Sequence, residues 1–220
     1  MVLTLLHLCD SLFPVGSFAY SDGLEWATST GLVSRAENLG AWIDVVLDEG
    51  IGRAEGPAVW RAWQACHDRE WDALAAVDEE VIALKPAATA RRSSRAMGVR
   101  LLTTWQALHP DPRLEQLLAR VKNPSLPVAF AAACASTTID RRVAVEAFAY
   151  TRLAATISAA MRLMPIGQTA AHALLARTLA RVPSVVGAIA DRDADPESFT
   201  PAMDIAAMSQ QYLHSRLFRS

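Results

Sequence analysis

Apolar residues recur along most of this chain at the spacing of an α-helix. One clear stripe contains Leu39, Trp42, Ile43, Val46 and Leu47. Residues three or four apart lie on the same face of a helix, so such a stripe predicts a helix with one side in a core. β-Branched residues that alternate over the length of a strand are nearly absent. The chain is therefore predicted to be all-α, an irregular bundle of about eight to ten helices.

Prolines and glycines divide these stripes into separate helices. Lys85-Pro86 and residues 165–167 (PIG) are expected helix ends, because the residue before a proline disfavours the α conformation. Residues 50–57 (GIGRAEGP) predict another interruption between two helices. The breaks are short and no long linker is present, so residues 1–220 are predicted to form one helical domain.

Three positions predict helix starts that are capped by side chains. Ser34 with Glu37, and Asp22 with Glu25, have the three-residue spacing of a capping box. Asp140 is expected to cap a long helix that ends near residue 164.

The composition limits the class of protein. Of the 220 residues, 52% are hydrophobic and 20% are charged, which is typical of a globular chain that buries a substantial core. The net charge of −2 argues against broad nucleic-acid binding. The chain shows neither a run of about 18 apolar residues nor a secretion signal, so we expect a cytoplasmic protein that does not enter a membrane.

Residues that could hold a metal are present but scattered. Cys9, Cys66 and Cys134 form no Cys-x-x-Cys pair, which indicates neither a disulfide framework nor a zinc site. Cys134 is expected in the core. His7 and Cys9 are two residues apart and would point in different directions from a helix. Because a tight site needs about three or four converging ligands, no metal site is predicted.

The motifs of nucleotide and hydrolase chemistry are also missing. Nothing matches the glycine loops that cradle phosphates, the G-x-S-x-G elbow or the H-E-x-x-H helix. No catalytic residues and no bound cofactor are therefore predicted. A helical enzyme with a pocket lined by tryptophans and His67 remains an alternative, because acid or base catalysis depends on distances that a sequence does not give.

Residues 10–25 (DSLFPVGSFAYSDGLE) predict a fixed turn between two helices. Pro14 has a locked φ, and Gly16 tolerates backbone angles that other residues avoid. Phe13 and Phe18 place bulky apolar groups in this loop. Such a loop either folds back onto its own core or is kept for a partner.

Arginines on one predicted helix could also serve a partner. Arg91, Arg92 and Arg95 share one arc of the helix, whereas Arg100 falls on the opposite side. One explanation is an ordinary solvated face. The other is contact with an acidic patch on a partner, because guanidinium groups pair well with carboxylates.

The C-terminal tail, residues 215–220, is predicted to bind a partner. Chain ends are usually polar and frayed, yet Leu217 and Phe218 are bulky and lie between Arg216 and Arg219. Aromatic residues and arginine are enriched at binding hot spots. The alternative is that Leu217 and Phe218 dock on the chain's own core.

Four segments of the chain resemble one protein family. Residues 10–25 match the pattern D-S-x-F-P-x-G-x-F-x-x-S-x-G-L-E, and three later segments are similar to the family as well: residues 92–102 (RSSRAMGVRLL), 162–168 (RLMPIGQ) and 204–220 (DIAAMSQQYLHSRLFRS). These segments occur in the expected order over nearly the whole chain. On this basis the chain is identified as a member of the urease accessory protein UreF family.

The chain departs from the family pattern in two places. Gln210-Gln211 stands where the family usually has His-Glu. Residues 123–126 (NPSL) lack a histidine that the family tends to have, and Ala131 replaces a usual glycine. Roles that need those histidines cannot be carried over. A rival interpretation is therefore a degenerate member that keeps the fold but no longer matures urease.

The resemblance implies an all-α, non-catalytic cytoplasmic protein that helps to load nickel into urease. Family members form a complex with the scaffold protein UreD, also called UreH, and with the GTPase UreG, and this complex engages apo-urease. A homodimer within the complex is also implied. The candidate partner contacts in this chain are Phe13, Pro14, Phe18, Tyr20, Arg92, Arg95, Arg216, Leu217, Phe218 and Arg219.

Overall fold

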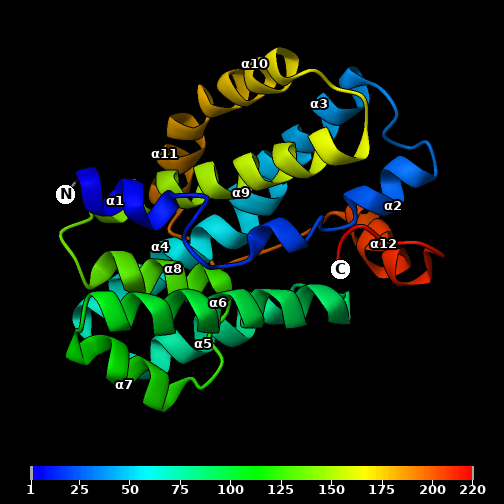
Figure 1. The fold of residues 1–220 in the computed structure, drawn as a ribbon. Helices are drawn as coiled ribbons and strands as arrows, with labels where there is room; N and C mark the ends of the chain where they lie inside the picture. The colour runs from blue at the N-terminus through cyan, green and yellow to red at the C-terminus, as the bar shows by residue number, and fades with distance from the viewer. Residues whose placement is uncertain (1, 220) are drawn as a thin grey trace.

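The computed structural model describes residues 2–219, and over this range the chain is built of helices without a β-strand (Figure 1). The predicted all-α bundle is therefore confirmed. The α-helices are α1 (Val2–Cys9), α2 (Leu24–Ser29), α3 (Ala36–Val45), α4 (Gly56–Asp68), α5 (Trp71–Ala83), α6 (Ala88–Leu108), α7 (Pro112–Arg120), α8 (Leu126–Ala135), α9 (Arg141–Leu163), α10 (Gln168–Leu179), α11 (Val182–Arg192) and α12 (Pro201–Ser209). Two 3-10 turns, η1 (Ser17–Ala19) and η3 (Gln210–Tyr212), and a π-helix, η2 (Val46–Glu55), complete the described elements.

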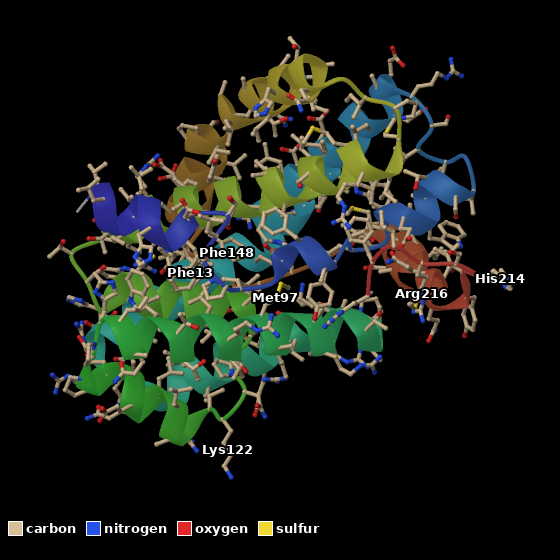
Figure 2. All side chains as sticks on the ribbon, in the orientation of Figure 1. Phe13, Met97, Lys122, Phe148, His214 and Arg216 are labelled. Atoms are coloured by element: carbon tan, nitrogen blue, oxygen red, sulfur yellow. The ribbon has the colours of Figure 1, made fainter. Side chains whose placement is uncertain are left out.

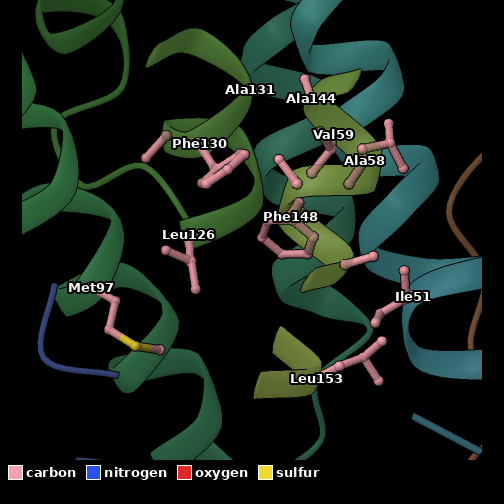
Figure 3. Packing of buried hydrophobic residues seen from close by; sticks show 14 of the residues in the cluster. Ile51, Ala58, Val59, Met97, Leu126, Phe130, Ala131, Ala144, Phe148 and Leu153 are labelled. Atoms are coloured by element: carbon pink, nitrogen blue, oxygen red, sulfur yellow. The ribbon is translucent and has the colours of Figure 1, made fainter. Parts of the chain in front are cut away.

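Helix α8 lies at the centre of the core. Every residue of α8 is buried, and the helix packs against α4, α6 and α9. Its sequence, LPVAFAAACA, suits this place because small alanine side chains let neighbouring helices come close. The rings of Phe130 and Phe148 meet edge to face with their centroids 5.5 Å apart (Figure 3). Cys134 is fully buried, as predicted.

Residues 50–57 do not interrupt the helix, contrary to the prediction. Helix α3 continues through the π-helix η2 into α4 without a break. Gly56 serves close packing rather than a turn, because a Cβ there would lie 2.4 Å from the carbonyl oxygen of Ile51 and 2.7 Å from Cδ1 of Ile189. π-Helical segments often mark functional sites. This one ends at Glu55, whose carboxylate is buried.

One of the three predicted caps is present in the described chain. Oδ1 of Asp140 accepts a hydrogen bond from the amide of Arg142 (2.8 Å) at the start of α9, which confirms the cap. Helix α3 begins after Arg35 without a side-chain cap, and α2 begins after Gly23. The predicted capping boxes are therefore wrong at both helices. The carboxylate of Glu25 binds residues that are distant in the sequence instead.

One described stretch, residues 168–192, has the length and hydropathy of a membrane span. It is not one continuous helix, because α10 ends at Leu179 and α11 begins at Val182. Arg181 lies between them and forms ion pairs with Asp44 (2.6 Å) and Asp48 (2.6 Å). These ion pairs hold the joint between α10 and α11 against α3 and η2.

Candidate functional site

The N-terminal turn and the C-terminal tail lie together on one face of the molecule. Helix α12 packs against α2, and the chain after it returns toward the turn (Figure 1). The amide of Arg219 donates a hydrogen bond to the carbonyl oxygen of Ala19 (2.8 Å). Residues 13–25 and 210–219 are together called the turn–tail site.

Buried Glu25 fastens the tail to the turn. Its carboxylate accepts hydrogen bonds from the backbone amides of Leu217 and Phe218 (3.2 Å for Phe218) and from the side-chain amide of Gln210 (3.3 Å). A buried carboxylate is costly unless hydrogen bonds satisfy its oxygens. These donors lie 185 to 193 residues further along the chain. The site therefore needs both ends of the sequence.

Gln210 joins the end of α12 to the start of α2. Its side chain is fully buried, and its Oε1 accepts hydrogen bonds from the amide of Gly23 and from Oγ of Ser21, each at 3.0 Å. Gly23 has a φ of +88°, and a Cβ there would lie 2.7 Å from the amide nitrogen of Ala207. Glycine is therefore required both for the backbone angle and for the close approach of α12.

Two arginines hold the turn from outside. Nη1 of Arg100 on α6 donates to the carbonyl oxygen of Val15 (3.1 Å), and Nη1 of Arg162 on α9 donates to that of Phe18 (2.8 Å). The guanidinium carbon of Arg162 also lies 4.4 Å from the ring centroid of Phe218, a cation–π contact. These contacts connect the turn to α6 and α9, and the tail to α9.

A chain of charged side chains, centred on buried Glu55, lies behind the turn. Arg152 on α9 donates to Asp22 (2.6 Å) and to Glu55 (3.0 Å), and Nζ of Lys85 donates to the other oxygen of Glu55 (2.8 Å). Burial opposes ionisation of Glu55, but the positive charges of Arg152 and Lys85 outweigh it and lower the pKa of Glu55 to about 2. Burial also acts against the charged form of Arg152, yet its carboxylate partners raise its pKa. A cavity of about 130 Å³ opens beside these charges.

Comparison with known proteins decides the family. A family model described as UreF matches residues 33–179. The chain is 34% identical to the urease accessory protein UreF of Azoarcus sp. (strain BH72), over 100% of this chain and 95% of that protein. It is 33% identical to the protein of the same name from Methylibium petroleiphilum, over 100% of this chain and 94% of that protein. The chain belongs to the UreF family. The matches to both relatives include the turn–tail site, which lies outside the residues that the family model matches.

Several of the contact residues suggested by the UreF pattern are exposed at the turn–tail site. Phe18 and Leu217 are large apolar side chains that are 43% and 55% exposed. Pro14 is also exposed, and Tyr20 is half-buried. The turn therefore presents apolar groups to solvent on a backbone that hydrogen bonds hold in place. Partner binding by these residues stays a prediction.

Phe13 and Phe218 also belong to the turn–tail site, but their side chains are buried in the core. Phe13 is 6% exposed and Phe218 is 3% exposed. The prediction of a free aromatic anchor is therefore corrected for Phe218, which docks on its own chain beneath Arg162. For Phe218, docking on the chain's own core is therefore the alternative that agrees with the structure. Arg216 and Arg219 are exposed on either side.

The arginines of α6 divide differently from the prediction. Arg95 donates to Asp78 (2.9 Å) and to the carbonyl oxygen of Asn123, so it joins α6 to α5 and to the loop before α8. Arg91 donates to backbone carbonyl oxygens of the loop between α5 and α6. Arg92 is exposed. Arg100, which falls on another arc of α6, reaches the turn.

Potential metal ligands do not gather at the site. Within residues 2–219, no three His, Cys, Asp or Glu side chains are grouped so that they could hold a metal ion. His7 lies beside His109, with ring centroids 6.3 Å apart. Burial raises the pKa of the nearby Cys9 thiol to about 11, which keeps it protonated at neutral pH. That this chain alone does not bind nickel tightly stays a prediction.

Proposed function

We propose that this chain is a non-catalytic scaffold for urease maturation. In this role it acts in the cytoplasm with the scaffold protein UreD (UreH) and the GTPase UreG, and the complex inserts nickel into apo-urease. The observation that carries the proposal is the full-length similarity to proteins named urease accessory protein UreF. The turn–tail site supports it, because two segments that resemble the family at opposite ends of the chain build one surface.

The site suits binding better than catalysis. Its buried polar groups, Glu25 and Gln210, are occupied by bonds within the chain. Its exposed groups are apolar or guanidinium side chains, which are typical of binding hot spots. A surface held in one shape before binding loses less entropy when a partner docks. The proposed role therefore works through contacts with other proteins.

We place the proposed homodimer contact on α1 and α9. Leu3, Leu6 and Leu12 are 80%, 60% and 88% exposed. Leu6 lines a groove of about 770 Å³ that also includes Tyr150 of α9, and Leu3 and Leu12 are near it in the sequence. A two-fold interface uses the same surface patch on both copies, so exposed leucines beside a groove would let each copy place its leucines in the groove of the other. Replacement of Leu3 and Leu6 by Ser should shift the mass measured by light scattering from dimer to monomer.

Complementation tests the main proposal. The resident UreF gene is deleted in a cell that makes urease. The wild-type chain, or a chain cut after Ser215, is then expressed in its place. We expect the wild type to restore the nickel content and activity of purified urease, and the cut chain to restore much less. Full urease activity in the deleted strain would contradict the proposal. Failure of a well-folded wild-type chain to restore activity would favour the degenerate family member instead.

A further inference from the structure

Five guanidinium groups in or near the turn–tail site have no carboxylate partner among the described residues. Ion pairs occupy many arginines elsewhere, such as Arg181 with Asp44 and Asp48. In contrast, no carboxylate within residues 2–219 forms an ion pair with any of the five. All five are exposed, although the whole chain has a net charge of −2. We call them the basic face: Arg92, Arg100, Arg162, Arg216 and Arg219.

The turn fixes the guanidinium groups of Arg100 and Arg162, and it fixes the backbone of Arg219. Arg100 and Arg162 each use Nη1 to hold a carbonyl oxygen of the turn, which leaves further N–H donors of exposed side chains for other acceptors. The backbone of Arg219 is held by Ala19. Guanidinium groups that are fixed in this way lose less freedom when they bind an acceptor.

The other two extend the basic face along its edges. Arg216 precedes the tail residues held by Glu25, and Figure 2 shows it beside α12. Arg92 lies eight residues before Arg100 on α6, about 12 Å along the helix and about 80° around it, so it lies at the edge of the face rather than beside Arg100. Helix α12 packs against α6, which brings these elements together.

The two carboxylates within residues 13–25 are already bound to other groups of the chain. Glu25 is buried and binds the tail amides, and Asp22 is paired with Arg152. Phe18 and Leu217 add exposed apolar area within the same turn and tail. An apolar centre with a charged surround is the usual anatomy of a protein–protein interface.

We propose that the basic face binds an acidic surface of a partner protein, with partner carboxylates on the guanidinium groups and apolar side chains against Phe18 and Leu217. The identity of that partner as a urease-assembly protein rests on the proposed function, whereas the acidic chemistry rests on the basic face alone. A guanidinium group can donate two parallel hydrogen bonds to a carboxylate or to a phosphate. We favour carboxylates over the phosphates of a nucleic acid as acceptors. Nucleic-acid-binding proteins are usually basic, whereas this chain as a whole is slightly acidic.

A pair of charge-reversal variants tests the inference. R92E/R216E changes two members of the basic face whose side chains make no ion pair with a described residue. R35E/K122E makes the same change in net charge at two exposed, unpaired positions elsewhere. Affinity for the purified UreD-type and UreG-type proteins is measured for each variant at about 50 and about 300 mM NaCl.

At low salt we expect R92E/R216E to bind one of these proteins about tenfold more weakly than wild type, and R35E/K122E to bind within about twofold. Added salt should weaken the wild type more than it weakens R92E/R216E. Equal losses in the two variants, or wild-type affinity in R92E/R216E, would overturn the inference.

A second measurement does not depend on urease assembly. The arginine side-chain NMR signals of the wild type are followed during titration with an oligoglutamate peptide or with a single-stranded DNA of equal charge. We expect the glutamate peptide to shift the signals of Arg100, Arg162 and Arg219 and to leave that of Arg35 in place. Such shifts without any binding of the accessory proteins would reject the proposed function and keep the inference. Tighter binding of the DNA, or no shift with the peptide, would reject the inference.

Discussion

The core around α8 and the turn–tail site are built in opposite ways. Helix α8 is buried along its whole length by apolar contacts with α4, α6 and α9. The turn–tail site depends on directional bonds to single groups, such as the carboxylate of Glu25 and the side-chain amide of Gln210. Apolar packing is spread over many weak contacts, whereas a buried hydrogen bond depends on one correctly placed partner. We therefore expect substitutions in the core to lower global stability, and substitutions at the site to loosen it locally.

The largest expected effect comes from the core. Replacement of Phe148 by Ala removes a fully buried ring that packs on Phe130, and should lower the free energy of unfolding by about 3–5 kcal/mol. Urea denaturation measures this change. The matched control is Tyr150→Ala on the same helix, where the side chain is 42% exposed and a much smaller loss is expected. Similar losses in both variants would contradict the central place of α8 and α9.

The charged side chains around Glu55 lie between the two regions. Substitution of Glu55 is expected to cause the next largest loss of stability. Glu55→Gln removes the negative charge shared by Arg152 and Lys85 and should cost about 2–3 kcal/mol, because Arg152 keeps Asp22 as a partner. The pKa of Glu55 is lowered in the folded state, from an ordinary value of 4.5 to about 2. Its contribution to stability is therefore present above about pH 4.5 and is lost as the pH falls toward about 2.

Urea denaturation of wild type and Glu55→Gln across this pH range checks both statements. The difference in unfolding free energy between them should shrink as the pH falls. A difference that stays constant from pH 7 to pH 3 would contradict the assignment to Glu55.

Removal of the tail should lower stability less than the core substitution does, but it should also weaken binding to partner proteins. Truncation after Ser215 removes Phe218 from the core, which should cost about 1.5–3 kcal/mol. It also removes Arg216 and Leu217 from the surface, so assembly with the accessory proteins should weaken even at temperatures where the cut chain is folded. Thermal unfolding and a pull-down on the same sample measure the two effects. Normal assembly by the folded, truncated chain would contradict the proposed role of the tail.

The smallest change in stability is expected at Leu217. Because this side chain is 55% exposed, Leu217→Ser should alter the free energy of unfolding by about 0.5 kcal/mol or less. The same variant should weaken binding if Leu217 lies at the centre of an interface. Hydrogen exchange at the amides of Leu217 and Phe218 shows whether the tail stays docked. A large stability loss would show that Leu217 belongs to the core.

The sequence predicts the helices well because their periodicity is local. The stripe beginning at Leu39, the cap at Asp140 and the buried Cys134 all agree with the structure. The interruption expected at residues 50–57 is wrong because Gly56 is placed there by packing against Ile189, which no nearby residue signals. Local preference is a weak guide where tertiary contacts decide.

The turn–tail site is harder to predict for the same reason. Glu25 has the spacing of a cap, yet the amides that bind it come from the opposite end of the chain. Arg100 falls on a different arc from Arg92, and nothing nearby in the sequence shows that the turn lies against it. In both cases the side chain forms its hydrogen bond with a segment that is distant in the sequence, and the local pattern gives no sign of that segment.

The link between Glu25 and Phe218 has a consequence for the order in which the molecule matures. Glu25 is synthesised 193 residues before Phe218, so its carboxylate has no tail amide to bind while the helices between them are being made. Those helices can pack during translation, whereas the turn–tail site is completed only after residues 210–219 have emerged. A chain that stops before these residues can therefore fold most of its body and still lack the turn–tail site.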